Sequence, residues 1–159
     1  MLQKITFLIF TVFFISTSCT KDNTILELHE EPVSVNTPPI TKDVFELVNK
    51  HRENLGKPAL VRNTIADSLG IDHTNYMIAH QKVSHANFKD RLLKLQQRVQ
   101  AKFAIENVAT GYPTAESAMK AWLENPKHKT NIEGNYTHIG IAAIKDSKNK
   151  YYFTQLFYR

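Results

Sequence analysis

Residues 139–158, IGIAAIKDSKNKYYFTQLFY, decide the fold class of this chain. Two segments rich in β-forming residues flank the polar stretch Asp146–Lys150, which has the composition of a turn. Strand, turn and strand in direct succession predict a β-hairpin at the C-terminus. Residues 102–107, KFAIEN, are expected to add a third strand to the same sheet.

Upstream of this hairpin, the apolar residues follow a helical period instead. Four segments repeat apolar side chains at three- and four-residue spacing, which indicates helices that pack by one face. Thr41 is expected to cap the first helix and Asn63 the second. The third lies around residues 92–99, and the fourth covers residues 114–124, where Trp122 falls on the apolar face and is expected to be buried. Helices first and an antiparallel sheet last predict an α+β fold.

The N-terminus has the features of an export signal. Met1–Lys4 is short and basic, and Ile5–Ile15 is an unbroken run of apolar residues and threonine with about the length of a signal-peptide core. The small residues Ser16–Ser18 come directly before Cys19, the only cysteine, as they do where lipoprotein signal peptides are cleaved. We therefore expect Cys19 to carry lipid and to anchor the protein to a membrane. The alternative is an ordinary signal peptide with an incidental Cys19.

The segment after Cys19 is polar and ends in Pro38-Pro39, so we expect an extended tether. Lys21-Asp22 resembles the short charged signals that send some lipoproteins to the cell surface. The expected location is the outer membrane, with the domain facing the periplasm or the cell surface. The predicted parts are a lipoprotein signal peptide at 1–18, a lipid-anchored tether at 19–40 and one folded domain at 41–159.

The charge and the cysteine count exclude two classes of protein. The formal net charge is +5, and loss of Lys4 with the signal peptide leaves +4. Because no dense block of lysine and arginine interleaves with aromatic residues, we do not expect a nucleic-acid partner. One cysteine forms no internal disulfide, so packing alone must stabilise the domain.

Three residues outside the helical stripes are candidates for a polar site. His85 lies between two expected helices, where polar residues are more often functional. Glu106 lies among apolar residues of an expected strand, so its carboxylate should be partly desolvated. His128 follows the fourth helix. Two imidazoles and a carboxylate can bind a divalent metal ion or form a proton-transfer pair. The histidines expected to have no such role are His29 in the tether and His51, His73 and His80 on helical stripes.

Six short blocks of the chain form a pattern when they are taken in order. They are Asn49–Arg52 with Leu55–Leu60, Ser84-His85 with Phe88 and Arg91, Glu106–Ala109, Trp122 with His128 and Asn131, Tyr136-Thr137 with Ile139–Ile141, and Phe153–Phe157. In these blocks the chain resembles the CAP superfamily, also called the SCP or PR-1-like domain, and specifically its bacterial branch without disulfides. The resemblance covers about residues 41–159.

This resemblance implies a fold and a cleft. The fold is a three-layer α-β-α sandwich around a small antiparallel sheet, and His85, Glu106 and His128 line its central cleft. Animal and plant relatives complete the cleft with a second glutamate at the position that is Asn125 here. Glu124 is one residue away and should point elsewhere, because helical neighbours differ by about 100°. The remaining set fits a metal site with open positions, with Zn²⁺ as the expected ion, or a hydrogen-bonded polar cleft.

The sequence is compatible with three functions. The first is a membrane-anchored extracytoplasmic domain whose cleft binds a divalent metal ion, a small ligand or an envelope component. The second is a metal-dependent hydrolase of envelope peptides or esters, in which His85 and His128 would hold Zn²⁺ and Glu106 would act as base or third ligand. The third is a structural envelope protein whose cleft is a relic. We favour the first, which is not an enzyme.

Overall fold

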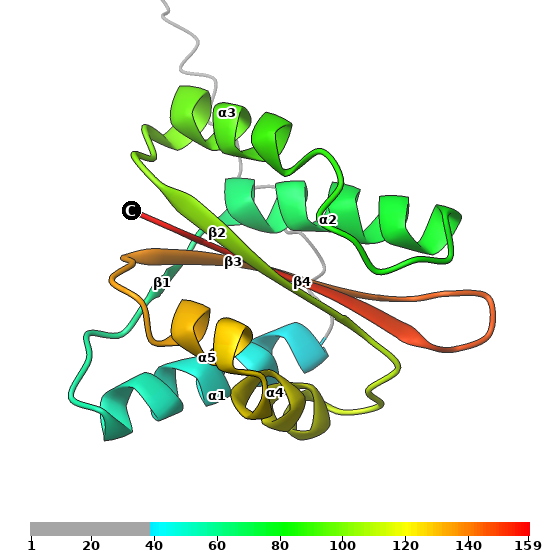
Figure 1. Ribbon diagram of the computed structural model, residues 1–159, viewed down its shortest axis with the longest axis horizontal. Helices are drawn as coiled ribbons and strands as arrows, with labels where there is room; N and C mark the ends of the chain where they lie inside the picture. Colours follow the sequence, from blue (N-terminus) through cyan, green and yellow to red (C-terminus); the bar gives the residue numbers. More distant parts are fainter. Residues whose placement is uncertain (1–38) are drawn as a thin grey trace, which may run out of the picture. The chain divides into compact units, whose positions relative to one another are not determined.

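The computed structural model describes residues 39–159, which Figure 1 shows as a mixed helical and β structure. The predicted signal peptide, Cys19 and the tether up to residue 38 lie outside the described residues. The helices are α1 (Pro39–Asn54), α2 (Thr64–Ala79), α3 (Phe88–Val99), α4 (Ala115–Glu124) and α5 (Pro126–Ile132). None of the helices within residues 39–159 is long and apolar enough to cross a membrane.

Four strands form one sheet in the order β1-β3-β4-β2. The predicted C-terminal hairpin is confirmed, since β3 (His138–Lys145) and β4 (Tyr151–Tyr158) pair in antiparallel fashion. β2 (Ala104–Thr110) pairs with β4 and is the third strand expected near residues 102–107, displaced toward the C-terminus. β1 (Val61–Arg62) is not predicted by the sequence pattern; it pairs with β3 in parallel, so the sheet is not purely antiparallel.

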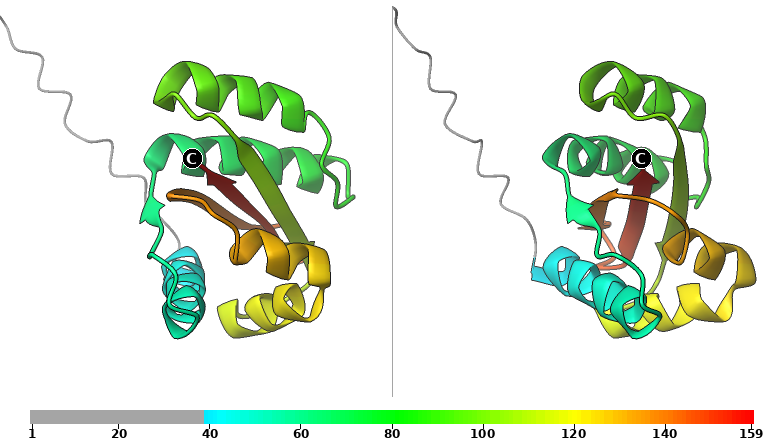
Figure 2. Two further views of the ribbon diagram at one scale, coloured as in Figure 1. Left: turned by 60° about the vertical axis from the view of Figure 1, so that its left-hand side comes forward. Right: turned by 90° about the vertical axis from the view of Figure 1, so that its left-hand side faces the viewer.

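The sheet lies between two helical layers, as the family resemblance implies. Helices α2 and α3 cover one face, and α1, α4 and α5 cover the other (Figures 1 and 2). Because successive strand side chains point to opposite faces, Phe153 and Phe157 pack under α1 and α4 while Leu156 packs under α2. Helix α2 lies directly on β3, where a Cβ added to Gly140 would collide with the backbone of Ala66. Only glycine permits this close approach.

The helix ends partly follow the predicted caps. Asn63 caps α2, because its side chain accepts a hydrogen bond from the Ala66 N–H at 3.0 Å. The prediction for Thr41 is wrong: α1 begins at Pro39, and Thr41 is a buried residue within its first turn. Proline at a first helical position costs no hydrogen bond, which explains the earlier start. Trp122 is buried as expected, at 1% exposure.

Candidate functional site

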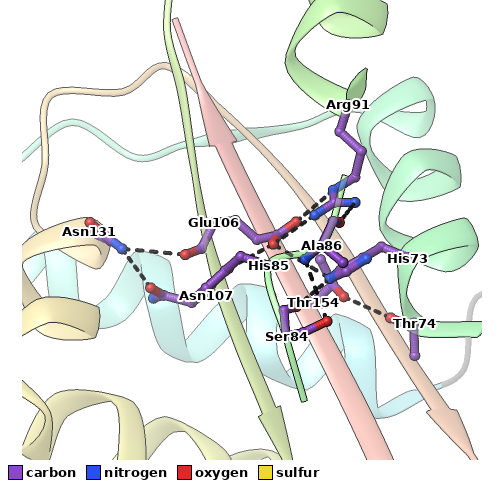
Figure 3. Close-up of polar contacts among 10 residues, drawn as sticks. All are labelled: His73, Thr74, Ser84, His85, Ala86, Arg91, Glu106, Asn107, Asn131 and Thr154. Carbon is purple, nitrogen blue, oxygen red and sulfur yellow. Dashed lines mark hydrogen bonds and ion pairs between the residues drawn. The ribbon is translucent and has the colours of Figure 1, made fainter. Parts of the chain in front are cut away.

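The polar site lies beside β2, where the loop between α2 and α3 passes the strand. His85 belongs to that loop, and Glu106 lies in the middle of β2. Figure 3 shows the two side chains meeting, with Nδ1 of His85 at 2.9 Å from Oε1 of Glu106. The Glu106 side chain is 1% exposed and that of His85 is 54% exposed. The predicted burial of Glu106 is therefore confirmed, and His85 connects it to solvent.

Arg91 of α3 holds the Glu106 carboxylate from the other side. Its Nε donates to Oε2 at 2.8 Å and its Nη2 donates to Oε1 at 3.0 Å (Figure 3). This two-bond geometry is the strongest form of an ion pair between these residue types. The third nitrogen, Nη1, donates to the carbonyl of Ala86 at 2.8 Å. Arg91 thus fixes both Glu106 and the loop that carries His85.

His73 of α2 belongs to the same network, although its place on a helical stripe predicts no role for it. Its Nε2 lies 2.7 Å from the carbonyl of Ser84 and 3.6 Å from Oε1 of Glu106. Because a carbonyl can only accept, Nε2 is the donor of that bond. Burial is the main cause that lowers the pKa of His73 below 6.5; the Glu106 carboxylate opposes this shift, and the guanidinium of Arg91 adds to it. A neutral His73 therefore holds the residue before His85.

Acidification is expected to destabilise the domain through His73. Since its folded pKa is lowered, the unfolded chain binds a proton first as the pH falls below 6.5, so stability is lost from there down to the folded pKa. Urea unfolding in the presence of a chelator, at pH values above and below 6.5, measures this loss. His73→Gln keeps a donor for the Ser84 carbonyl and should lose less stability. An equal loss in both proteins would contradict the assignment to His73.

Helix α5 carries His128 and Asn131 to the opposite side of the site. Asn125 caps this helix with its side-chain oxygen, which accepts from backbone N–H groups of the first turn. Asn107 of β2 then ties the helix to the sheet, because its Nδ2 donates to the His128 carbonyl at 3.1 Å. Its Oδ1 accepts from Nδ2 of Asn131 at 2.8 Å (Figure 3). The strand residue next to Glu106 thus places His128.

The far end of α5 is fixed by α1. Arg52 is 1% exposed, and its Nη1 donates to the carbonyls of Ile132 and Gly134, both at 2.8 Å. The neighbouring His51 lies 2.8 Å from the Glu133 carboxylate, which adds a second contact between α1 and the end of α5. Two buried arginines therefore fix the two walls of the site, Arg91 on the side of His85 and Arg52 on the side of α5.

A cavity of about 220 Å³ lies between these walls, and we call it the cleft. All three candidate residues line it, so the structure brings His85, Glu106 and His128 together. Burial is the main cause that lowers the pKa of His128 below 6.5, and His85 lowers it further. The residues lining the cleft are His85, Phe88, Ile105, Glu106, Lys127, His128 and Asn131.

The hydrogen bonds decide which atoms remain for a ligand. Both oxygens of Glu106 already accept from His85 or Arg91, and Nδ1 of His85 is bonded to Glu106. In the described part of the chain, Nε2 of His85 and the ring nitrogens of His128 remain free to contact a ligand or a metal ion. Within residues 39–159 the structure contains no group of three or more His, Cys, Asp and Glu residues arranged to hold a metal ion.

The comparisons with known proteins agree with this architecture. The model of the cysteine-rich secretory protein family, CAP, matches residues 45–157. Protein YkwD of Bacillus subtilis, an uncharacterized protein, is 32% identical over 111 residues, which are 65% of this chain and 42% of YkwD. The chain therefore spans less than half of that relative.

Solved structures share the fold at low identity. An outer surface protein from Borrelia burgdorferi has a TM-score of 0.70 at 18% identity, covering 77% of this chain and 93% of that one. An extracellular protein with an SCP domain from Bacillus anthracis has a TM-score of 0.65 at 24% identity, covering 76% of this chain and 40% of that one. The matched family model and the three-layer fold lead to one conclusion: this chain belongs to the CAP family.

Proposed function

We propose that this chain is an extracytoplasmic, membrane-anchored CAP-domain protein whose cleft binds a divalent metal ion or a small ligand. The observation that carries the proposal is the set of atoms left free in the cleft. Glu106 holds His85 by Nδ1, which leaves Nε2 of His85 without a partner within residues 39–159, and both His85 and His128 line the cavity. Carboxylates hold metal-binding histidines in this way in many proteins.

The residues present fit Zn²⁺ as a two-histidine site. Imidazole nitrogens are suitable ligands for zinc, and with two protein ligands the ion would keep open positions for water or an added ligand. Glu106 fits the role of a positioning group better than that of a third ligand, because His85 and Arg91 already occupy its oxygens. The same occupancy weakens the hydrolase alternative, which needs Glu106 as a base or ligand.

Zinc titration tests this proposal. The purified full-length protein is expected to bind Zn²⁺, and His85→Ala or His128→Ala should weaken binding by more than the roughly 10–100-fold typical for loss of an outer-shell partner. His80→Ala is the matched control, since His80 is exposed at the end of α2 and does not line the cleft. Isothermal titration calorimetry measures the affinities. Equal affinity in the parent, His85→Ala and His128→Ala would refute the metal site.

The extracytoplasmic location rests on the N-terminal sequence and on the relatives. The run Ile5–Ile15 before Cys19 supports export and lipidation. The similar proteins from Borrelia burgdorferi and Bacillus anthracis are described as an outer surface protein and an extracellular protein. An outer-membrane anchor with the domain in the periplasm or at the surface is consistent with both.

Mass spectrometry of the mature N-terminus tests the anchor. We expect a first residue of Cys19 that carries lipid, and Cys19→Ser should leave the protein unprocessed by the lipoprotein pathway. In cell fractionation, this variant should then be lost from the membrane fraction or appear as the uncleaved precursor. A mature chain that begins elsewhere, or an unmodified Cys19, would refute the lipoprotein prediction.

A further inference from the structure

The outer edge of β2 offers backbone groups that its sheet does not use. Phe103 and Arg159 exchange both backbone hydrogen bonds, at 3.2 and 3.0 Å, and the N–H of Gly111 donates to the carbonyl of Tyr151 at 2.9 Å. In an antiparallel pair such bonded positions alternate. Odd-numbered residues of β2 therefore bond to β4, and the N–H and C=O groups of even-numbered residues face outward.

Two even-numbered residues lie beside the site. The outward carbonyl of Glu106 accepts only a long bond, 3.5 Å, from Nδ2 of Asn131. No bond joins the N–H or C=O of Val108 to another segment within residues 39–159. Edge groups of this kind are a template for an added strand.

A second cavity, of about 160 Å³, continues the cleft along this edge. His128 lines both cavities and so stands between them. The second cavity is lined by apolar and aromatic residues, including Val83, Val108, Tyr112 and Trp122, and by the polar residues Thr110, Asn125 and His128. The buried indole N–H of Trp122 has no hydrogen-bond partner within residues 39–159. The apolar members of this lining can contact an apolar side chain of a ligand.

The charges of the cleft favour an anionic group at the other end. The Glu106 carboxylate is matched by Arg91, which leaves the ammonium group of Lys127 and the two imidazoles facing the cavity. A carboxylate can accept from the Lys127 ammonium and from a ring N–H of His128, and it can accept from Nε2 of His85 when that ring is protonated, because Nδ1 already donates to Glu106. The two ends are separated along β2 by the residues from Glu106 to Thr110, about 13 Å at roughly 3.3 Å per residue.

We propose that the outer edge of β2 binds an extended peptide that carries a carboxylate. Its backbone pairs with Val108, its carboxylate lies beside His85, Lys127 and His128, and an apolar side chain enters the second cavity. About four peptide residues span the distance. A fatty acid would supply the carboxylate and the apolar part but would leave the groups of Val108 unpaired. This inference rests on the proposed ligand-binding role of the cleft and names the ligand class.

Two blocked peptides and their controls test the proposal by NMR on the purified full-length protein without metal. Ac-Leu-Ala-Ala-Ala-Glu-NH2 supplies a side-chain carboxylate four residues after the leucine, and Ac-Leu-Ala-Ala-Ala-OH supplies a terminal one. At least one should shift the backbone amide signal of Val108. N-methylation of the peptide amide that pairs with Val108 should weaken binding about tenfold, the cost of one lost hydrogen bond. Lys127→Met should weaken it by a similar factor, about tenfold, and exposed Lys120→Met should not.

The outcomes separate this inference from the metal proposal. Absence of any Val108 shift at millimolar peptide would overturn it, and so would equal binding of decanoate with no effect of N-methylation. If zinc binds the parent but not His85→Ala while both peptides fail, only the peptide inference is lost. If a peptide binds by these criteria and zinc does not, the peptide inference stands and the metal proposal is lost.

Discussion

Replacing Arg91 with methionine is expected to destabilise the domain by about 3–5 kcal/mol, the cost of leaving one partner of a buried ion pair alone. The side chains of Arg91 and Glu106 are 8% and 1% exposed, so solvent cannot replace the lost guanidinium. Urea unfolding followed by circular dichroism measures the change. Arg98→Met is the matched control, because Arg98 lies on the same helix and is exposed.

The double variant Arg91→Met/Glu106→Gln separates the charge from the packing. It removes both charges, so part of the lost stability should return relative to Arg91→Met alone. A single Arg91→Met variant as stable as the Arg98→Met control would contradict the role of Arg91 as the group that balances Glu106.

The second large effect is expected from replacing Arg52 with methionine. This change should lower the free energy of unfolding by about 2–5 kcal/mol. The guanidinium of Arg52 donates hydrogen bonds to the carbonyls of Pro58, Ile132 and Gly134. Leaving a buried acceptor without its partner costs about 1–3 kcal/mol. Lys50→Met is the matched control on the same helix, since the Lys50 side chain is 68% exposed and its ion pair with Glu53 lies at the surface.

Arg52 also provides a test of how the cleft is built. Because it holds the end of α5, Arg52→Met should loosen the helix that carries His128 and weaken zinc binding without touching the cleft. Measurement below the unfolding transition of the variant separates this effect from global unfolding. Zinc affinity equal to that of the parent would show that α5 is fixed without Arg52.

The sequence predicts those elements whose pattern is local. The hairpin of β3 and β4 follows from its β-forming residues and the turn at Asp146–Lys150, and Asn63 has both the residue type and the position of a cap. The burial of Glu106 follows from its apolar neighbours in an edge strand. These features depend on a few consecutive residues, so no tertiary information is needed.

The features that sequence reasoning missed are short or depend on distant partners. β1 has two residues and exists through its pairing with His138 and Ile139. α5 has seven residues, too few to show a period, although Asn125 followed by Pro126 is a helix-start signal that could have revealed it. From the family resemblance, Asn125 is known only as the position of the absent second glutamate. In the structure, Asn125 caps the helix that carries His128.

His73 shows the limit of interpreting one side chain by its helical stripe. Its spacing on α2 is that of a core residue, and it is buried as such a residue should be. The bond to Ser84 and the approach to Glu106 come from the return of the loop after α2. The contribution of Arg91 to the site likewise follows from how α3 lies over β2, although Arg91 belongs to one of the family-like blocks.

We propose that Glu106 orients His85 so that its Nε2 and the imidazole of His128 bind a divalent metal ion. Nitrogen-detected NMR of the histidine side chains during zinc titration tests it most directly. We expect the signals of Nε2 of His85 and of one ring nitrogen of His128 to shift on zinc addition, while Nδ1 of His85 keeps its hydrogen bond to Glu106. Zinc binding that leaves both imidazoles unchanged, or that displaces Glu106 from His85, would contradict it.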